Sequence, residues 1–526
     1  MTMTPLDDFL GFIEQKHGEE TWVSLYKRIT KDDKSEDGAF YSALVSQSAT
    51  ERAIRQPSWD LMLGGGGPGL VMGYENGEEV TTYLAQGDGE YRRIVIYRDF
   101  HGRKDNYFEI LEEFRLFHNL YFDQKSSTYL AFDDAGDEVE VIKILPSEIK
   151  VRKGYLKSFM AATQTNLLLY FEFTRHFTSN IGYKDDIKND NLCIVIYSGQ
   201  SYSEGFSYFT RALGKKLIRC ETIEKSGVWP FTAAKKYEDF IIGGDLDAPI
   251  EYNCDPDELA NYFGANPNAP HYLTPVFFKK EVMQKYYNSC DYEISDGYLS
   301  RKGSWSLRFD NNAPGHVSVF LGDLGRDLPS KEQVYWKSFN FVPDGHSISE
   351  TNYQRSFLGN FYDPESPEHK FKYAFVEVQK ICSEKLGWSL FLPLADKDTH
   401  FLNSIRSMLT REQSEFDALI LAIAKITIDS VNVKGLRKYL DQDDESKSIV
   451  LLGMFLQKLN IQNHEELSTF LRGVQSVRSS GVAHRKGTEY DKVIAKLNID
   501  EDNYQAEFDE ILSKFVSLFE SIVKAI

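Results

Sequence analysis

The chain has few cysteines, and none of them lie close together in the sequence. The five are Cys193, Cys220, Cys254, Cys290 and Cys382. Zinc sites and redox dithiols need paired cysteines a few residues apart, so we expect neither, and we interpret the five as reduced, mostly structural thiols. The chain also lacks an apolar run of about 20 residues, the length that a membrane-spanning helix needs. Residues Met1 to Glu20 lack the basic and then apolar order of a secretory leader. These absences predict a cytoplasmic protein that does not enter a membrane.

Basic residues are fewer than acidic ones, 60 against 79. The 526 residues carry a formal net charge of −19, which opposes non-specific binding to nucleic acid because most of the surface repels phosphate. Any nucleic-acid site must therefore be local. Hydrophobic residues make up 42% of the chain, enough for packed cores, and the length favours about three domains.

Residues 1–180 mix helical and strand patterns. Apolar spacing predicts one or two amphipathic helices from Asp8 to about Arg28 and another over Glu109–Tyr121. Short apolar runs predict strands over Arg93–Tyr97 and Val139–Leu145. We therefore expect a mixed α/β region in this part of the chain.

Residues 181–395 are rich in strand and turn signals. Leu192–Tyr197 is typical of a buried strand, and a helix is expected to run from Thr274 to Tyr287. The segments Tyr298–Phe309 and His316–Leu321 flank a turn-forming sequence and predict a hairpin. The stretches YLTPVFFKKEV and FLGDLGRDLP resemble segments of uncharacterised bacterial proteins, which implies a bacterial source. We interpret this region as a strand-rich α+β sensor domain.

Residues 396–526 contain helical patterns and no strand signal. Apolar residues recur at helical spacing in five segments, which are Glu412–Val431, Lys447–Leu459, Glu465–Arg478, Glu489–Leu497 and Tyr504–Ile526. They predict an all-helical bundle. The whole chain is therefore expected to be an α+β multidomain protein with a helical effector at its C-terminal end.

A basic window near the end of the chain carries the strongest chemical signal. Between Leu467 and Gly487 there is no acidic residue, while Arg472, Arg478, Arg485 and Lys486 are basic and His484 lies among them. A histidine titrates near neutral pH and can move a proton, and an arginine can hold a phosphate and its developing charge. This pair is the minimum equipment for cleaving RNA without a metal.

These residues resemble the HEPN family, helical-bundle domains of prokaryotic RNA-cleaving toxins and defence proteins. The family signature is an arginine, four to six residues and a histidine at the junction of two helices. Here Arg478, five residues and His484 match it, and the resemblance covers about residues 410–526. It implies a dimer in which two motifs form one cleft. It also implies that His484 acts as general acid or base and Arg478 as phosphate clamp, leaving a 2′,3′-cyclic phosphate and a 5′-hydroxyl. Ser479 departs from the Asn, Asp or His that is usual at its position.

Two alternatives stay open. A metal-dependent nuclease would need an aspartate close to a Glu-x-Lys pair, so that carboxylates hold Mg²⁺ and the lysine steadies water or phosphate. Asp133 or Asp134 with Glu148 and Lys150 matches that requirement loosely. The second alternative is a non-catalytic sensor or oligomerisation scaffold, in which Arg478 and His484 only cap helix ends.

The favoured interpretation is a conditionally active bacterial endoribonuclease that uses neither a metal nor a cofactor. Arg478 and His484 are its expected catalytic residues. RNA would contact a second set of residues, namely Arg472, Ser479, Arg485 and Lys486. The expected partners are RNA, a second or further copy of the chain, and an unidentified trigger ligand or protein. A role in defence against phage rests on the family resemblance alone.

Overall fold

The structure is a computed structural model that contains both helices and strands, which confirms the predicted α+β multidomain class. It describes residues 18–55, 69–84, 91–180, 182–395, 398, 400–442, 445–482, 488–497 and 499–526. The chain divides into two compact units, Met1–Ala234 and Lys235–Ile526. Within the described ranges, no helix is both long and apolar enough to cross a lipid bilayer.

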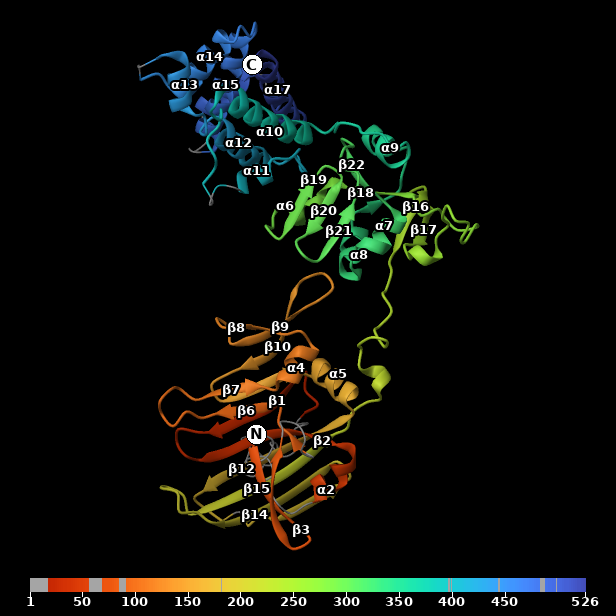
Figure 1. Ribbon diagram of the computed structural model, residues 1–526, viewed down its shortest axis with the longest axis vertical. Coiled ribbons are helices and arrows are strands. Elements are labelled where there is room, and N and C mark those ends of the chain that lie inside the picture. The colour runs from red at the N-terminus through yellow and green to blue at the C-terminus, as the bar shows by residue number, and fades with distance from the viewer. Residues whose placement is uncertain are drawn as a thin grey trace. The chain divides into compact units, whose positions relative to one another are not determined.

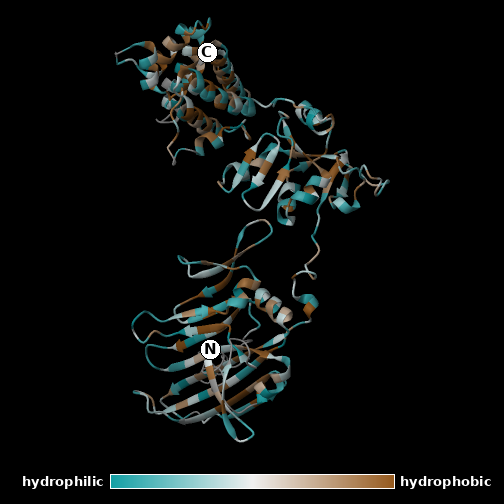
Figure 2. Ribbon diagram, in the orientation of Figure 1, coloured by the Kyte–Doolittle hydropathy of each residue, from teal (hydrophilic) through white to brown (hydrophobic). Residues whose placement is uncertain are grey.

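The first unit is built on one antiparallel sheet of eleven strands, counted over the described part of the chain (Figure 1). The strand order is β13-β14-β15-β12-β2-β1-β11-β10-β9-β8, and β5 pairs with β2. The bounds are β1 Trp22–Thr30, β2 Glu36–Ser46, β5 Tyr91–Arg92, β8 Tyr121–Asp123, β9 Thr128–Phe132, β10 Glu138–Ile144, β11 Glu148–Arg152, β12 Thr165–Phe177, β13 Asp185–Asn189, β14 Leu192–Gln200 and β15 Tyr208–Ile218. Hydrophobic and hydrophilic residues alternate along several of these strands (Figure 2). The central strands β2 and β12 are instead buried on both faces, because consecutive residues such as Leu167 and Leu168 belong to two different cores.

Short elements surround this sheet. The hairpins are β3 Gly69–Glu75 with β4 Glu78–Leu84, and β6 Val95–Arg98 with β7 Tyr107–Ile110. The helices and turns are η1 Gln47–Ala49, α2 Thr50–Arg55, α4 Glu112–Phe117, α5 Lys153–Thr163 and η2 Ile223–Lys225. Leu156, Phe159 and Met160 of α5 are fully buried in the core that α5 shares with the sheet, so this helix closes the main core of the unit.

The helix predicted around Trp22 to Arg28 is wrong. These residues form β1, which pairs with both β2 and β11. Val23 and Leu25 are two residues apart and both are buried, which is the side-chain alternation of a strand. Pairing with strands that are distant in the sequence therefore decides the structure here. Residues 8–17 of the same prediction lie outside the described residues. The helix predicted over 109–121 is shorter than expected, because only α4 is helical.

The sheet crosses the domain boundary predicted at residue 180. Strand β12 precedes that position and β15 follows it, yet the two pair continuously from Leu167 with Ile218 to Phe177 with Tyr208. Residues on both sides of position 180 therefore belong to one sheet and one unit. The division between the two units comes later, after Ala234.

The second unit begins with small sheets and short helices. Its strands are β16 Asp239–Gly244, β17 Pro249–Asn253, β18 Pro275–Lys279, β19 Tyr292–Ser295, β20 Tyr298–Arg301, β21 Trp305–Arg308, β22 His316–Phe320 and β23 Asn340–Phe341. Its helices and turns are η3 Pro256–Glu258, η4 Lys280–Met283, α6 Gln284–Tyr287, α7 Leu321–Asp327, α8 Ser330–Lys337 and α9 Glu350–Ser356. The sheets β22-β18-β23 and β19-β20-β21 share one core with Trp336 fully buried in it.

Two predictions for this part of the chain are wrong. The helix expected from Thr274 begins instead as strand β18, because Val276, Phe277 and Phe278 are all buried, and a short apolar run cannot distinguish a fully covered strand from a helix. The hairpin expected between residues 298–309 and 316–321 does not form. Strand β20 pairs with β21, and β22 pairs with β18.

The rest of the second unit is a helical bundle, as predicted. Its elements are α10 Pro367–Leu386, α11 His400–Ser404, α12 Gln413–Thr427, α13 Val433–Leu440, α14 Ser448–Lys458, α15 His464–Val477, η6 Arg478–Val482, α16 Thr488–Leu497 and α17 Tyr504–Ala525 (Figure 1). All five predicted helices are present. Helix α10 was not predicted, and its residues were assigned to the strand-rich region. It belongs to the bundle, because Phe371 contacts Phe515 and Phe519 of α17.

Candidate functional site

The predicted RNA-cleaving motif begins where α15 ends. Arg478 is the C-terminal cap of α15, and the chain continues from there as the π-helical turn η6. The hydroxyls of Ser476, Ser479 and Ser480 each donate to the carbonyl oxygen four residues earlier, at 2.7 to 2.8 Å. Serines bonded in this way tend to bend a helix, and single π-helical turns are frequent at functional sites. The serine-rich sequence thus favours an irregular helical backbone at Arg478.

An ion pair fixes the side chain of Arg478. Its Nη2 lies 2.9 Å from Oδ2 of Asp429, a residue just beyond the end of α12. The two side chains are 28% and 32% exposed, so both still face solvent. A guanidinium has five N–H donors, and this contact uses one of them. Arg478 is therefore oriented by α12 and keeps an accessible surface on which a phosphate can bind.

The other predicted residues of this motif are placed only in part. Arg472 is exposed on α15, and Ser479 is half-buried. They are seven residues apart, which is close to two helical turns, so they lie near the same side of the helix axis. His484, Arg485 and Lys486 lie outside the described residues.

The residues of the alternative magnesium site are not brought together. Asp133 and Asp134 lie in the turn before β10, whereas Glu148 and Lys150 lie on β11, which starts after β10 ends. Strand β10 runs from Glu138 to Ile144, so the two groups are separated by about 20 Å along the sheet. Two carboxylates must share one ion in such a nuclease site. The observed separation is incompatible with that arrangement.

Glu148 is already satisfied by its neighbours. Its carboxylate accepts a hydrogen bond from Ser24 Oγ at 2.6 Å and lies 2.9 Å from Lys150 Nζ. Burial opposes ionisation, but these two hydrogen bonds outweigh it and hold the pKa of Glu148 below its ordinary value. Among the described residues, no cluster of three or more His, Cys, Asp or Glu side chains could hold a metal ion.

A polar cavity of about 280 Å³ lies in the strand-rich part of the second unit. The turn between β19 and β20, strands β21 and β22, and helices α7 and α9 surround it. Its charged and polar lining includes Asp296, Asp310, Asn312, Ser318, Asp323 and Arg355. The cavity is close to the size range of small-molecule sites. No sequence motif marks this cavity.

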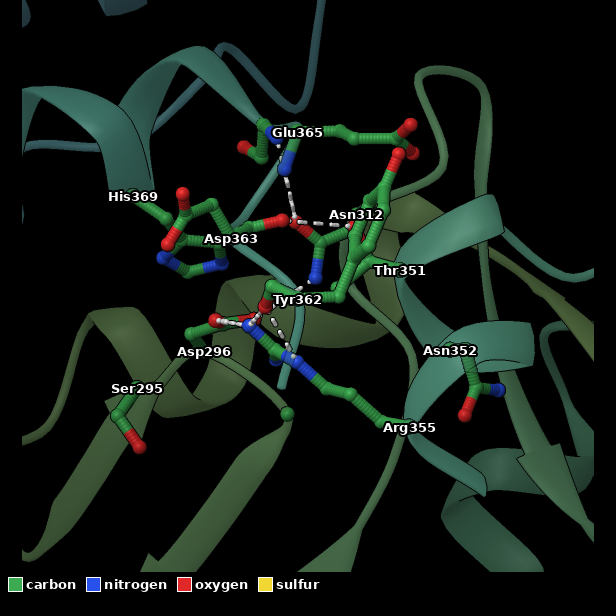
Figure 3. Close-up of polar contacts among 12 residues, drawn as sticks. Ser295, Asp296, Asn312, Thr351, Asn352, Arg355, Tyr362, Asp363, Glu365 and His369 are labelled. Carbon is green, nitrogen blue, oxygen red and sulfur yellow. Dashed lines mark hydrogen bonds and ion pairs between the residues drawn. The ribbon is translucent and has the colours of Figure 1, made fainter. Parts of the chain in front are cut away.

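One wall of the cavity is a chain of charged and amide groups (Figure 3). Arg355 Nη2 on α9 lies 2.7 Å from Oδ2 of Asp296, and Asn312 Nδ2 donates to the other Asp296 oxygen at 2.7 Å. Burial opposes ionisation of Asp296, but these two hydrogen bonds outweigh it and lower its pKa. Arg355 also donates to the carbonyl oxygen of Tyr362. Asp296 is therefore an ionised group held in one orientation.

The same wall is bonded to the start of helix α10. Asn312 Oδ1 accepts from the backbone N–H of Glu365 at 2.9 Å and of Ser366 at 3.2 Å (Figure 3). N–H groups at the start of a helix have no acceptor within the helix, and Asn312 supplies one here. Asp310 plays a similar part for α9, because its carboxylate accepts from the N–H and hydroxyl of Ser349 at 2.7 and 2.8 Å. The cavity wall thus sets the position of two helices.

The cavity lining also contains a buried carboxylate on α7. Asp323 is 6% exposed, and one of its oxygens accepts from the Tyr272 hydroxyl and from Arg326 Nη2, both at 2.8 Å. Burial raises the pKa of Asp323, while Tyr272, Arg326 and Arg308 oppose that rise. Burial and the Asp323 charge raise the pKa of Tyr272. The Asp323 carboxylate is therefore a hydrogen-bond acceptor whose charged form is disfavoured by burial.

Ser318 on β22 lines the cavity and is 2% exposed. Its hydroxyl has no hydrogen-bond partner among the described residues. A buried hydroxyl without a partner costs about 1–3 kcal/mol. A bound polar molecule could offset this cost, and native structures retain few such groups without a reason.

Helix α10 joins the cavity wall to the bundle. Glu368, in its first turn, is 6% exposed and accepts from the Tyr287 hydroxyl at 3.0 Å and from the N–H of Ser407 at 2.8 Å. Tyr287 belongs to α6, and Ser407 lies just before α12. Burial opposes ionisation of Glu368, but Lys372 and His369 together with these hydrogen bonds lower its pKa. A continuous bonded path therefore runs from Asn312 through α10 to the segment that leads into α12.

The sequence signalled only part of the cavity. The residues Asp310-Asn311-Asn312 were recognised as turn formers, but their partners lie up to about fifty residues away, at Ser349 and Glu365. Arg355 and Asp296 come from separate elements with no shared motif. Only the folded chain brings them together.

Neither a family model nor a curated protein nor a solved structure matches this chain. Its function is therefore inferred from its residues and their geometry.

Proposed function

We propose that the helical bundle is a metal-independent endoribonuclease domain in which Arg478 and His484 act on the scissile phosphate. The observation that carries this proposal is the setting of Arg478. Its guanidinium is partly exposed, is oriented by Asp429, and lies at an irregular turn between two bundle helices. The acid-free sequence around it adds local positive charge to an acidic chain.

The chemistry needs one proton transfer at each end of the reaction. His484 takes the proton of a ribose 2′-hydroxyl, and the 2′-oxygen attacks the adjacent phosphorus. The bond to the 5′-oxygen breaks, and that oxygen leaves with a proton from a second acid, for which the His484 of a second copy is suited. Arg478 binds the phosphate and stabilises the added negative charge. The products are a 2′,3′-cyclic phosphate and a 5′-hydroxyl.

Two features of this proposal come from the HEPN resemblance. The first is assembly, since two copies would supply both histidines to one cleft, as a dimer or a larger homo-oligomer. The second is a role in a bacterial cytoplasm as a defence effector against phage. The bonded path from the polar cavity through α10 adds a route by which a trigger ligand in the strand-rich region could bias the bundle.

A non-catalytic bundle is the second candidate. The Arg478–Asp429 ion pair favours it, because a guanidinium bound to a carboxylate also serves to join α12 to α15. In that case the bundle mediates assembly and the cavity supplies regulation. The magnesium nuclease is not proposed, because Asp133 and Glu148 lie at opposite ends of β10.

Cleavage of RNA by the full chain separates the two candidates. Labelled single-stranded RNA is incubated with the protein in EDTA, alongside Arg478→Ala and His484→Ala. Cleavage by the unmodified chain that falls by about 10³-fold or more in both variants supports the nuclease. Cleavage that survives both substitutions, or that requires Mg²⁺, contradicts it. Arg411→Ala, an exposed arginine before α12, is the matched control and should cleave normally.

A further inference from the structure

The cavity in the strand-rich region has its acidic groups inside and its basic groups at the mouth. Asp310 and Asp323 are 2% and 6% exposed. By contrast, Arg308 is exposed, and the side chain of Arg326 is 54% exposed. Both line the cavity. Arg326 Nη2 lies 2.8 Å from Asp323 Oδ1, and the same guanidinium also donates to both carboxylate oxygens of Asp327, at 2.7 and 2.8 Å. The most buried charged groups of the lining are therefore carboxylates, and the most exposed ones are guanidiniums.

This arrangement selects for a molecule with two different ends. Hydroxyl groups suit the floor, because carboxylate oxygens accept hydrogen bonds and the Ser318 hydroxyl lacks a partner. An anionic group suits the mouth, where guanidiniums bind phosphate. Tyr298 lines the mouth, and Arg308 lies 5.6 Å from the centre of its ring. Such a pairing holds the guanidinium in a fixed plane.

Other ligand classes fit less well. A metal ion would need the carboxylates, but Asp296 is already bonded to Arg355 and Asn312, and Asp310 to Ser349. Free phosphate bound at the mouth would leave the buried Ser318 hydroxyl without a partner. A wholly apolar ligand would leave the polar floor without partners. The volume of about 280 Å³ accommodates a molecule of sugar or nucleoside size.

We propose that this cavity binds a phosphate monoester of a sugar, either alone or as part of a nucleotide. The sugar hydroxyls donate to Asp323 and exchange hydrogen bonds with Ser318. The phosphate binds the Arg308 guanidinium, beside Arg326, which Asp323 and Asp327 hold in place. The site is independent of the nuclease proposal, because none of these residues belongs to the bundle. The ligand would contact the wall whose Asn312 holds the start of α10.

Calorimetric titration of the full chain tests this site directly. The probes are ribose 5-phosphate, adenosine 5′-monophosphate, ribose and inorganic phosphate. We expect at least one ester to bind with a Kd below about 1 mM and at least about tenfold tighter than either ribose or phosphate. Tighter binding of the nucleotide identifies a nucleotide site, and tighter or equal binding of ribose 5-phosphate identifies a sugar-phosphate site.

Two variants localise the binding. Arg308→Met removes an exposed guanidinium at the mouth and should weaken the ester by about tenfold or more without unfolding the protein. Asp323→Asn removes the charge of the inner acceptor and should have a similar effect. Lys302→Met, in the turn between β20 and β21 and outside the cavity lining, should bind normally. The proposal is overturned if neither ester binds at about 10 mM, if phosphate binds as tightly as the esters, or if Arg308→Met binds them unchanged.

Discussion

Arg478 and Asp429 form an ion pair of 2.9 Å between the ends of two bundle helices, 49 residues apart in sequence. Surface ion pairs contribute little to stability, on the order of 0–1 kcal/mol. Their main effect here is geometric, because the carboxylate fixes the direction of the guanidinium. Asp429 is thus a positioning residue for the phosphate clamp, and no local sequence motif marks it.

Replacing Asp429 should slow RNA cleavage while changing the free energy of unfolding only slightly. Asp429→Asn keeps the shape of the side chain but removes the charge that orients Arg478. We expect single-turnover cleavage to fall by about tenfold, with a loss of no more than about 1 kcal/mol in the free energy of unfolding. Glu510→Gln, which removes a comparable surface pair with Lys514 on α17, should leave cleavage unchanged. Equal cleavage by Asp429→Asn and the unmodified chain would show that the ion pair has no positioning role.

The Asp296 carboxylate should make the second unit sensitive to acid. Its pKa is lowered in the folded chain because hydrogen bonds from Arg355 and Asn312 outweigh burial. The stability that it contributes is therefore complete above its unfolded pKa of about 3.9 and is lost as the pH falls through the lower folded value. Asp296→Asn should cost stability at pH 7, and the cost should shrink at about pH 2. Urea denaturation at both pH values measures this, and a cost independent of pH would refute it.

Asn312 should be important for the stability of the second unit. It is 6% exposed and bonds to Asp296 and to two N–H groups before α10. Asn312→Ala leaves these groups without partners, so we expect a loss of about 2–4 kcal/mol in the free energy of unfolding. Asn360→Ala, which removes an exposed side-chain bond to Gln354, is the control and should cost less than about 0.5 kcal/mol. Similar losses in the two variants would contradict the capping role.

Helix α7 should tolerate no side chain at Gly325. A Cβ atom there would lie 1.8 Å from the carbonyl oxygen of Cys254, whereas a Cβ at Gly315 meets nothing within 4 Å. Gly325→Ala should therefore destabilise the protein by about 3 kcal/mol or more, because backbone must move. Gly315→Ala should be close to neutral. Thermal unfolding of both variants checks the placement of α7, and a stable Gly325→Ala protein would show that α7 packs differently.

The sequence predicted the bundle better than the sheets. Helices such as α17 were predictable because their apolar spacing extends over many turns within one segment. Strand β1 was missed because its structure depends on pairing with β11, more than 120 residues later. Strand β18 was missed because a fully covered strand and a buried helix have the same composition over five residues. Local patterns carry no information about such distant partners.

The residues of the candidate sites were also predictable from the sequence only where they lie in one local motif. Arg478 was found because it belongs to a short motif within one region of the chain. Its partner Asp429 and the cavity residues Asp296 and Arg355 were not, because each comes from a different element. Their significance depends on contacts that only the fold creates.

The chemical identity of the RNA ends is the most direct test of the account. RNA incubated with the full chain in EDTA, with and without ribose 5-phosphate, is analysed for its new termini. The nuclease proposal predicts 2′,3′-cyclic phosphate and 5′-hydroxyl ends, formed by the unmodified chain and absent with His484→Ala. New 5′-phosphate ends, cyclic-phosphate ends that persist in His484→Ala, or intact RNA under both conditions would contradict it.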